Sequence, residues 1–239
     1  MKPAPLLVIR PEPGNAATLA AARATGLEAH GEPLFEIVAT AWDATPATEF
    51  DAVLLGSANA LRHGGGALAR YVALPAYVVG KTTAEAARQA GFAVAAVGSG
   101  GLQGLTARLA GDGHRRVLRL AGAEHGALTV PPDTAIATVV VYKARPLPLS
   151  TASAALLGDD TVVMLHSAAA AHHFAAECDR MSISRASIAI ACLGGRIAAA
   201  AGDGWASVAS AERPDDFALL ALAVRMCQNG VLGDTDNKS

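Results

Sequence analysis

The 239-residue chain has few aromatic residues, little net charge and only three cysteines. Aromatic residues make up 4% of the chain and the formal net charge at pH 7 is −2. The chain therefore offers neither the stacking surfaces nor the basic field that nucleic-acid binding needs. The cysteines, Cys178, Cys192 and Cys227, are odd in number and lack CxxC spacing, so the pattern indicates neither a disulfide framework nor a zinc site. We expect all three to be small core residues.

Long hydrophobic runs are also missing. No stretch of the sequence approaches the roughly 18–20 apolar residues without charge, Gly or Pro that a membrane-spanning helix needs. The segment Met1 to Ile9 carries one Lys and a short apolar run before Arg10, which falls short of a signal peptide. We expect a cytoplasmic protein with no membrane partner.

What the chain does have is a large aliphatic supply. Hydrophobic residues make up 52% and charged residues 17%, which is typical of a folded protein and not of a disordered one. Short runs rich in Val, Ile and Leu alternate with Ala-rich stretches at helical spacing. This alternation predicts an α/β fold in which helices bury both faces of parallel strands.

The sequence also repeats itself. DAVLLGSANAL at 51–61 resembles DTVVMLHSAAA at 160–170, which aligns Ser57 with Ser167. Later segments follow in step at a nearly constant offset: 76–92 with 188–205, and 93–110 with 206–227. More loosely, LLVIR at 6–10 matches RVLRL at 116–120. We therefore expect two halves built on one plan, with the β-branched stretches 33–40 and 135–145 as extended connections.

Familiar phosphate and nucleophile motifs fail. Gly80, Lys81 and Thr82 imitate the end of a P-loop, but Pro75 stands where the leading glycine belongs. GSGGLQG at 98–104 has the wrong spacing for a dinucleotide-binding loop. Neither Ser57 nor Ser167 lies in a GxSxG elbow. No cofactor is expected.

Three histidines superficially suggest a metal site. His172 and His173 are adjacent and so point to different faces of a helix, and apart from Glu177 no carboxylate stands at helical spacing near them and His166. The better interpretation is a solvated helix surface, and no metal is expected.

Small polar residues recur where a helix follows a buried strand. They are Ser57 and Asn59, Lys81 to Thr83, Ser99, Ser167, and Gly194 to Arg196. The first N–H groups of a helix lack partners and carry partial positive charge, so several helix starts at one sheet edge could bind carboxylates. The alternative is that each is only an N-cap, worth ~1 kcal/mol.

The order and spacing of several segments resemble the uroporphyrinogen-III synthase family, tetrapyrrole enzymes that close and isomerise linear hydroxymethylbilane. These segments are VIRPEP, PLFEI, DAVLLGSANAL, YVVGKTTAEAARQAGF, VLRLAG, VVVYKARPLP, VVMLHSAAAAHHF and PDDFALLALAV. The resemblance implies two flavodoxin-like α/β lobes with parallel sheets, joined by a two-stranded linker. The lobes would comprise 1–34 with 149–230, and 41–135; the linker strands would be 35–40 and 136–148, and 231–239 would form a disordered tail.

The resemblance also implies roles for particular residues. Tyr142 matches the family's important tyrosine, Thr83 its cleft threonine, and Arg10 the basic residue after the first strand. Ser57 and Ser167 match paired strand-end serines, whereas Ile197 replaces the second-half counterpart of Thr83. Tyr142 is thus the candidate catalytic residue, and the candidate substrate-binding residues are Arg10, Ser57, Asn59, Lys81, Thr82, Thr83, Ser167 and Gly194.

The implied substrate is a linear tetrapyrrole with eight carboxylates. We expect a monomer that uses neither metal nor cofactor, with a possible transient contact with the preceding pathway enzyme. A different class of protein stays open from the residues alone, because duplicated α/β lobes also form small-molecule binding or sensor proteins without catalysis.

Overall fold

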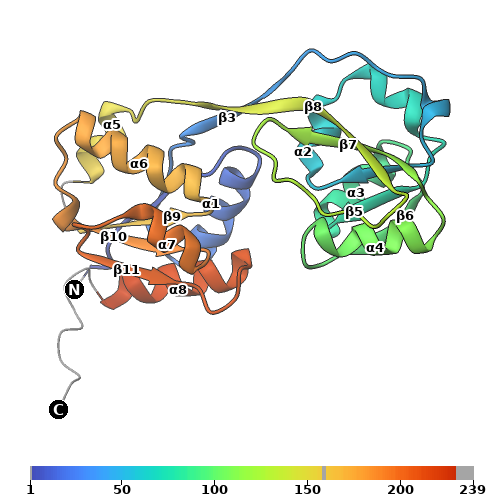
Figure 1. Cartoon of the computed structure of the whole chain (residues 1–239). Coiled ribbons are helices and arrows are strands. Elements are labelled where there is room, and N and C mark those ends of the chain that lie inside the picture. The colour runs from blue at the N-terminus through green and yellow to red at the C-terminus, as the bar shows by residue number, and fades with distance from the viewer. Residues whose placement is uncertain (1, 158–159, 230–239) are drawn as a thin grey trace. The chain divides into compact units, whose positions relative to one another are not determined.

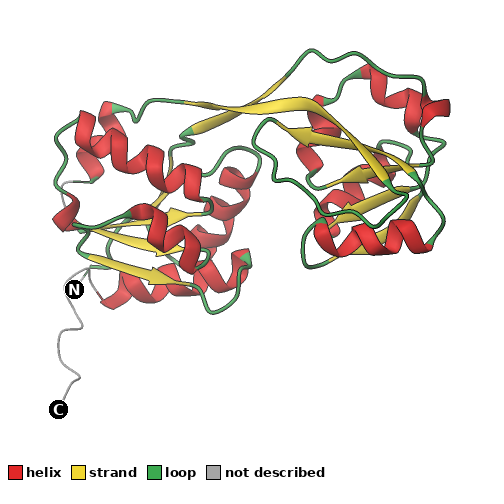
Figure 2. Cartoon of the chain, in the orientation of Figure 1, coloured by secondary structure: helices red, strands yellow, loops and turns green. Residues whose placement is uncertain are grey.

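The computed structural model describes residues 2–157 and 160–229, so the predicted tail 231–239 lies outside the described residues. The chain divides into two compact units, which Figures 1 and 2 show with their helices and strands. Unit 1 comprises Met1–Glu36 with Pro146–Ser239, and unit 2 comprises Ile37–Arg145. Both units are α/β, as the alternation of strands and helices predicts.

Unit 1 contains a five-stranded sheet in the order β11-β10-β9-β1-β2, and every ladder in it is parallel. Its strands are β1 (Leu6–Val8), β2 (Ala29–Gly31), β9 (Thr161–Leu165), β10 (Ile188–Cys192) and β11 (Ser207–Ser210). Its helices are α1 (Gly14–Ala24), α5 (Thr151–Leu156), α6 (Ala168–Arg180), α7 (Gly195–Ala201) and α8 (Asp216–Asn229), with the short 3-10 turn η3 (Arg185–Ser187).

Helices cover both faces of the unit 1 sheet. Val8, Met164 and Ala191 pack with residues of α1 and α8 in one core cluster. The alternate residues, such as Val163 and Ile190, are fully buried as well, and α6 and α7 contact β9 and β10. Burial on both faces explains why these strands are continuous apolar runs and not alternating ones.

Unit 2 contains most of a six-stranded sheet in the order β3-β8-β7-β4-β5-β6, in which Phe35 and Glu36 of β3 and Pro146 of β8 belong to unit 1. Its strands are β3 (Phe35–Ala39), β4 (Ala52–Leu55), β5 (Ala76–Val79), β6 (Val94–Gly98), β7 (Arg116–Gly122) and β8 (Ala135–Pro146). Its helices are α2 (Ala58–His63), α3 (Lys81–Gln89) and α4 (Gln103–Gly111), with 3-10 turns η1 (Ala47–Glu49) and η2 (Gly66–Tyr71).

The two faces of the unit 2 sheet are covered differently. On one face, Val53, Leu55 and Leu118 pack under α2, η2 and α3. On the other face, Ala52, Leu54 and Val117 pack with α4, which contacts β5 and β6. Beside β7 and β8 this second face carries the loop 123–134, whose Leu128 joins Ile136 against the same cluster. A loop and not a helix therefore lies against this part of the sheet.

Two details differ from the sequence-based expectations. The stretch 135–145, expected as a connection, also pairs in parallel with β7, from Ala135 opposite Arg116 to Tyr142 opposite Gly122. The prediction that Ser99 opens a helix is wrong, because α4 begins at Gln103. Gly101 in the intervening turn has a φ of 89°, a conformation that glycine adopts readily and that does not continue a helix.

The three cysteines are free and buried, as predicted. Burial raises the pKa of Cys178 and Cys227 to about 12 and that of Cys192 to about 11, so these thiols stay protonated and unreactive at neutral pH. Within residues 2–157 and 160–229, no helix has the length and apolar character needed to cross a membrane.

Candidate functional site

In unit 2 the predicted polar residues meet at the carboxyl edge of the sheet. Ser57 follows β4, Lys81 follows β5, and Gly122 ends β7. These strands are parallel neighbours, so their ends lie on the same edge, where open α/β sheets bind ligands. Ser57 is the N-cap of α2 and its Oγ accepts a hydrogen bond from the backbone N–H of Asn59 at 3.2 Å. The capping role is thus present, and the hydroxyl proton of Ser57 is still available for donation.

Tyr142 lies at the same edge. It stands opposite Gly122 where the β7–β8 register shifts, and its carbonyl accepts from the backbone N–H of Ala123 at 2.9 Å. The half-buried ring presses so closely on Gly122 that a Cβ there would lie 2.6 Å from Cε2 and 3.0 Å from the phenol oxygen. Gly122 is therefore needed to place the phenol where it is.

A cavity of about 210 Å³ joins these residues. Its lining includes Ser57, Leu102, Arg119, Gly122 and Tyr142. The structure thus brings together the candidate catalytic residue and one predicted binding residue, Ser57. It also adds a residue that the sequence analysis did not single out, Arg119.

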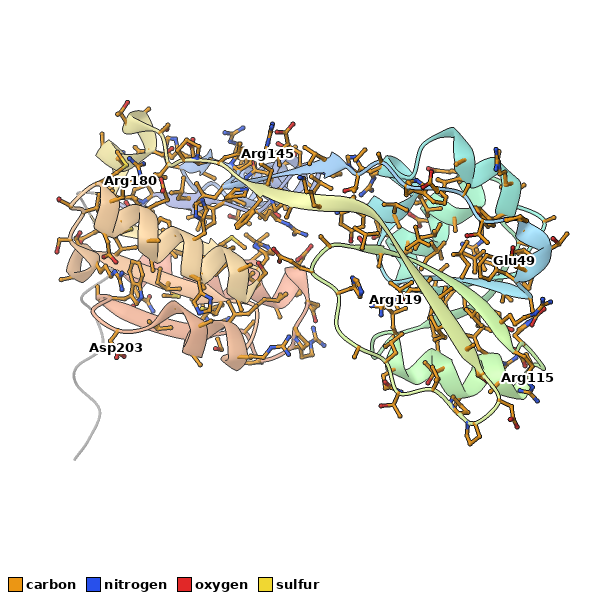
Figure 3. The ribbon with its side chains drawn as sticks, turned by 45° about the horizontal axis from the view of Figure 1, so that its top comes forward. Glu49, Arg115, Arg119, Arg145, Arg180 and Asp203 are labelled. Atoms are coloured by element: carbon orange, nitrogen blue, oxygen red, sulfur yellow. The ribbon has the colours of Figure 1, made fainter. Side chains whose placement is uncertain are left out.

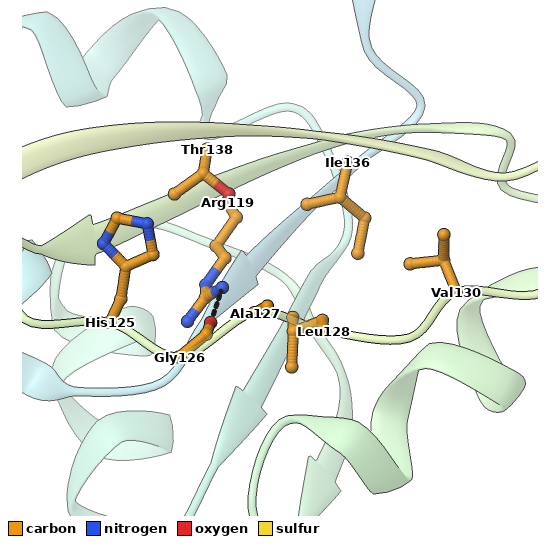
Figure 4. Close-up of a pocket in the computed structure, with 8 residues that line it drawn as sticks. All are labelled: Arg119, His125, Gly126, Ala127, Leu128, Val130, Ile136 and Thr138. Atoms are coloured by element: carbon orange, nitrogen blue, oxygen red, sulfur yellow. Dashed lines mark hydrogen bonds between the residues drawn. The ribbon is translucent and has the colours of Figure 1, made fainter.

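Arg119 also lines a second cavity of about 380 Å³, with His125, Leu128, Ile136 and Thr138 among its walls (Figure 4). The two cavities therefore share one guanidinium, which extends from the middle of β7 (Figure 3). Arg119 is only 5% exposed. Its Nη1 donates to the carbonyl of Gly126 at 2.8 Å, and its Nε is buried with no hydrogen-bond partner among the described residues.

Burial lowers the pKa of Arg119, while the nearby Tyr142 phenol acts in the opposite direction. Arginine starts so far above neutrality that the guanidinium stays charged. The signal that could have revealed this residue is simple. RVLRL places a charge in the middle of an apolar strand, and a buried charge without a partner is costly unless something binds it.

His125 is the other polar ring beside both cavities. Its Nδ1 lies 2.8 Å from the carbonyl oxygen of Gly122. Since a carbonyl only accepts, Nδ1 carries the proton, and Nε2 of the neutral ring is left as an acceptor.

The other predicted residues of unit 2 lie at helix starts. Lys81 and Thr82 are exposed in the first turn of α3, whereas Thr83 is 5% exposed. Thr83 is the third residue of α3 and Ile197 the third of α7, and both are buried. Asn59 accepts from Arg62 at 3.2 Å.

Unit 1 places Arg10, Ser167 and Gly194 just beyond the ends of the neighbouring strands β1, β9 and β10. Ser167 caps α6 by accepting from the backbone N–H of Ala170 at 3.1 Å. Gly194, in extended conformation, precedes α7. As in unit 2, the predicted residues share one sheet edge, and the serine serves as an N-cap.

Arg10 is held in place from two sides. Its Nη1 lies 2.8 Å from Oδ2 of Asp216, and its carbonyl accepts from the amide of Asn15, which also donates to the carbonyl of Val8 at 2.7 Å. Asn15 is 1% exposed, so it fixes the turn that carries Arg10. Unlike Arg119, Arg10 already has a carboxylate partner.

His166 corrects the interpretation of the histidines as solvated. Its side chain is only 10% exposed, with Nε2 3.8 Å from Oδ1 of Asp216, and neither ring nitrogen has a hydrogen-bond partner among the described residues. Burial, followed by the charge of Arg10, lowers its pKa to about 4 against the opposing effect of Asp216. His166 lies between β9 and α6, whereas His172 is exposed on α6.

No group of three or more His, Cys, Asp or Glu side chains is arranged to hold a metal ion in the described part of the chain. The polar groups at the two sheet edges are instead hydroxyls, guanidinium groups and helix N–H groups. These groups suit recognition of anions and hydrogen-bond acceptors.

Comparison with solved structures supports the fold. The chain is similar to the uroporphyrinogen-III synthetase from Helicobacter pylori 26695, with 17% identity, a TM-score of 0.63, and coverage of 94% of this chain and 99% of that one. It also matches a mutant uroporphyrinogen III synthase from the extremely thermophilic bacterium Thermus thermophilus, with 17% identity, a TM-score of 0.47, and coverage of 92% and 97%. At this identity the likeness to the first structure shows the fold. A comparison with curated protein sequences finds no significant match.

A family model provides the decisive match. The model described as uroporphyrinogen-III synthase HemD matches residues 16–221. This range covers most of both units and includes Ser57, Arg119 and Tyr142 at the unit 2 sheet edge. The chain therefore belongs to the uroporphyrinogen-III synthase HemD family.

Proposed function

We propose that the protein is a uroporphyrinogen-III synthase. It closes hydroxymethylbilane into a macrocycle, inverts the last pyrrole ring and releases one water. The observation that carries the proposal, in a chain of this family, is the cavity at the carboxyl edge of the unit 2 sheet, where Tyr142 and Ser57 lie with Arg119.

The reaction begins with the terminal hydroxyl of the substrate. Its C–O bond breaks, the oxygen leaves with the bonding electrons and a proton as water, and the pyrrole nitrogen loses its proton to give an azafulvene. The phenol of Tyr142 can donate a hydrogen bond or a proton to the departing oxygen. Its half-buried position in the lining of the cavity, with Ser57 and Gly122, supports this role.

The azafulvene carbon is then attacked by the substituted carbon of the last pyrrole, which forms a spiro intermediate. Breaking the older bond at that carbon and closing at the free carbon inverts the ring, and loss of a proton restores the pyrrole. The substrate supplies most of this reactivity, so the protein contributes mainly by holding a flexible chain in the geometry that leads to inversion.

We assign recognition of the eight carboxylates to polar groups at the sheet edge of each unit. The starts of α3, α6 and α7 present N–H groups together with Lys81, Thr82, Ser167 and Gly194, and Arg10 and Arg119 add positive charge. Thr83 is buried, so we assign its hydroxyl a role in orienting the first turn of α3 for binding.

Incubation with enzymatically generated hydroxymethylbilane tests the proposal. After oxidation and chromatographic separation, the type III isomer should predominate, whereas a blank without protein should yield type I. The assay should give the same result after dialysis against a chelator. Type I product alone at every protein concentration would overturn the proposal, and activity restored only by one metal would overturn its metal-free mechanism.

A further inference from the structure

We propose that Arg119 binds one carboxylate of the ligand, whose aliphatic stem occupies the cavity beside the loop 123–134. The identification of this carboxylate as a tetrapyrrole side chain rests on the proposed function. The carboxylate site itself rests on the surroundings of Arg119.

The buried guanidinium of Arg119 has no counter-charge among the described residues. Arg119 is 5% exposed, and its ordinary partner would be an Asp or Glu. The described residues place no carboxylate within ion-pairing distance of it, although Glu124 lines the smaller cavity. Arg10 shows the contrast, since Asp216 already pairs with it at 2.8 Å. A buried guanidinium without a carboxylate is unfavourable in the free protein and favourable once an anion arrives.

The guanidinium of Arg119 is held in one orientation. Nη1 is occupied by the carbonyl of Gly126, which fixes the plane of the group. Nε is buried and unpaired among the described residues. The edge formed by Nε and Nη2 presents two parallel N–H groups, and this spacing matches the two oxygens of a carboxylate.

The walls of the larger cavity beside Arg119 are mainly apolar. The cavity of about 380 Å³ has apolar walls formed by Leu128, Val130 and Ile136, with polar groups from His125 and Thr138 (Figure 4). Apolar walls around a single charged fork suit an aliphatic acid of the acetate or propanoate type. Inorganic phosphate, which is hydrated on all sides, would lose hydrogen bonds to water that apolar walls cannot replace.

The loop 123–134 covers the site. Beside Arg119 the sheet face carries a loop, in which Ala123 to Ala127 are exposed, and not a helix. The carbonyl of Gly126 in this loop is the partner of Nη1. The same arginine lines the smaller cavity with Tyr142, so a carboxylate bound at Arg119 would position the attached pyrrole beside the phenol. Arg119 is accordingly a positioning residue.

Side-chain NMR of the full chain tests the site without using catalysis. Protein labelled with 15N should show a slowly exchanging Nε–H signal for Arg119, assigned by its absence from Arg119→Lys. Titration with sodium propanoate should shift this signal, with saturation at ~1–100 mM, as expected for one small carboxylate. Propanamide, a neutral analogue of the same shape, and sodium chloride should leave it unchanged. No shift with propanoate, or an equal shift with chloride, would overturn the proposal.

Activity provides the second arm. Arg119→Met should raise KM for hydroxymethylbilane ~10-fold or more, while thermal unfolding occurs at the same or a higher temperature because an unpaired buried charge is removed. The control is Arg88→Gln, since Arg88 is an exposed arginine at the end of α3, and it should change neither value. If the protein forms type III product and Arg119→Met has the wild-type KM, the inference fails and the proposed function stands. If no product forms but propanoate shifts the Nε–H signal, the carboxylate site stands and the proposed function fails.

Discussion

Substituting alanine for Gly122 tests whether the position of the Tyr142 phenol matters. A Cβ at residue 122 would lie 2.6 Å from Cε2, 2.7 Å from Cζ and 3.0 Å from the phenol oxygen of Tyr142. Ordinary carbon contacts are about 3.6 Å, so the ring must move by about 1 Å. The φ of Gly122 lies outside the left-handed region, so the backbone itself accepts alanine.

The substitution should separate activity from stability. The displaced group is the outer end of a half-buried side chain, so we expect a stability loss of only about 1 kcal/mol, at the low end for overpacking. A misplacement of about 1 Å at a reacting centre lowers the rate ~10²-fold. We therefore expect a large fall in kcat with a small fall in the unfolding temperature.

The assay is the rate of type III formation, measured with urea unfolding on the same samples. Gly104→Ala is the matched control, because a Cβ there meets nothing within 4 Å and the residue lies in α4; it should keep full activity. In the background of Tyr142→Phe, Gly122→Ala should add little further loss, since both changes act on one phenol. Full activity of Gly122→Ala with a displaced ring would refute the catalytic role of Tyr142.

Three other substitutions give separate tests. Tyr142→Phe should lower kcat ~10²-fold or more with little change in product affinity; full rate with a lower unfolding temperature would identify Tyr142 as packing. Backbone N–H bonds from Arg116 and Arg115 and the Arg116 side chain lower the pKa of Asp51 from 3.8 to about 2. Because solvent screens this surface carboxylate, Asp51→Asn should lower the free energy of unfolding by about 1 kcal/mol at pH 7. The stability difference between Asp51→Asn and wild type should vanish as the pH falls from about 4 to about 2, and a difference independent of pH would contradict this prediction. The pKa of His166 is lowered from 6.5 to about 4 in the folded protein, so protonation favours the unfolded state. The free energy of unfolding should therefore fall by about 3 kcal/mol as the pH falls from about 6.5 to about 4. Urea unfolding should show this loss in wild type and His172→Phe but not in His166→Phe. The same pH dependence of the free energy of unfolding in all three proteins would refute this prediction.

The fold could be predicted from the sequence because its information is local and repeated. Strands such as 52–55 and 161–165 are apolar runs because they are buried on both faces, and each is followed by a serine that caps a helix. The parallel order then places Ser57 and Ser167 at sheet edges. The start of α4 was missed because its N-cap, Leu102, uses no side-chain cap, so the serine three residues earlier drew the prediction.

The candidate site was predictable only in part. Tyr142 came from the family resemblance, and its closeness to Ser57 depends on a register shift at Gly122 that no periodicity encodes. Arg119 was not predicted because the apolar residues on both sides of it in β7 indicate only a buried strand. The low pKa of His166 likewise reflects Arg10 and Asp216, which act on it from distant parts of the chain.

In the proposed reaction, the protein directs ring closure through inversion of the last pyrrole. Hydroxymethylbilane carrying 13C in the last bridge carbon and in the pyrrole carbon bonded to it tests this most directly, by NMR of the oxidised product. We expect the one-bond 13C–13C coupling to disappear in the product, because the older bond breaks and the bridge carbon bonds to the other side of the ring. A product that retains the coupling would show closure without inversion and would refute the proposed reaction.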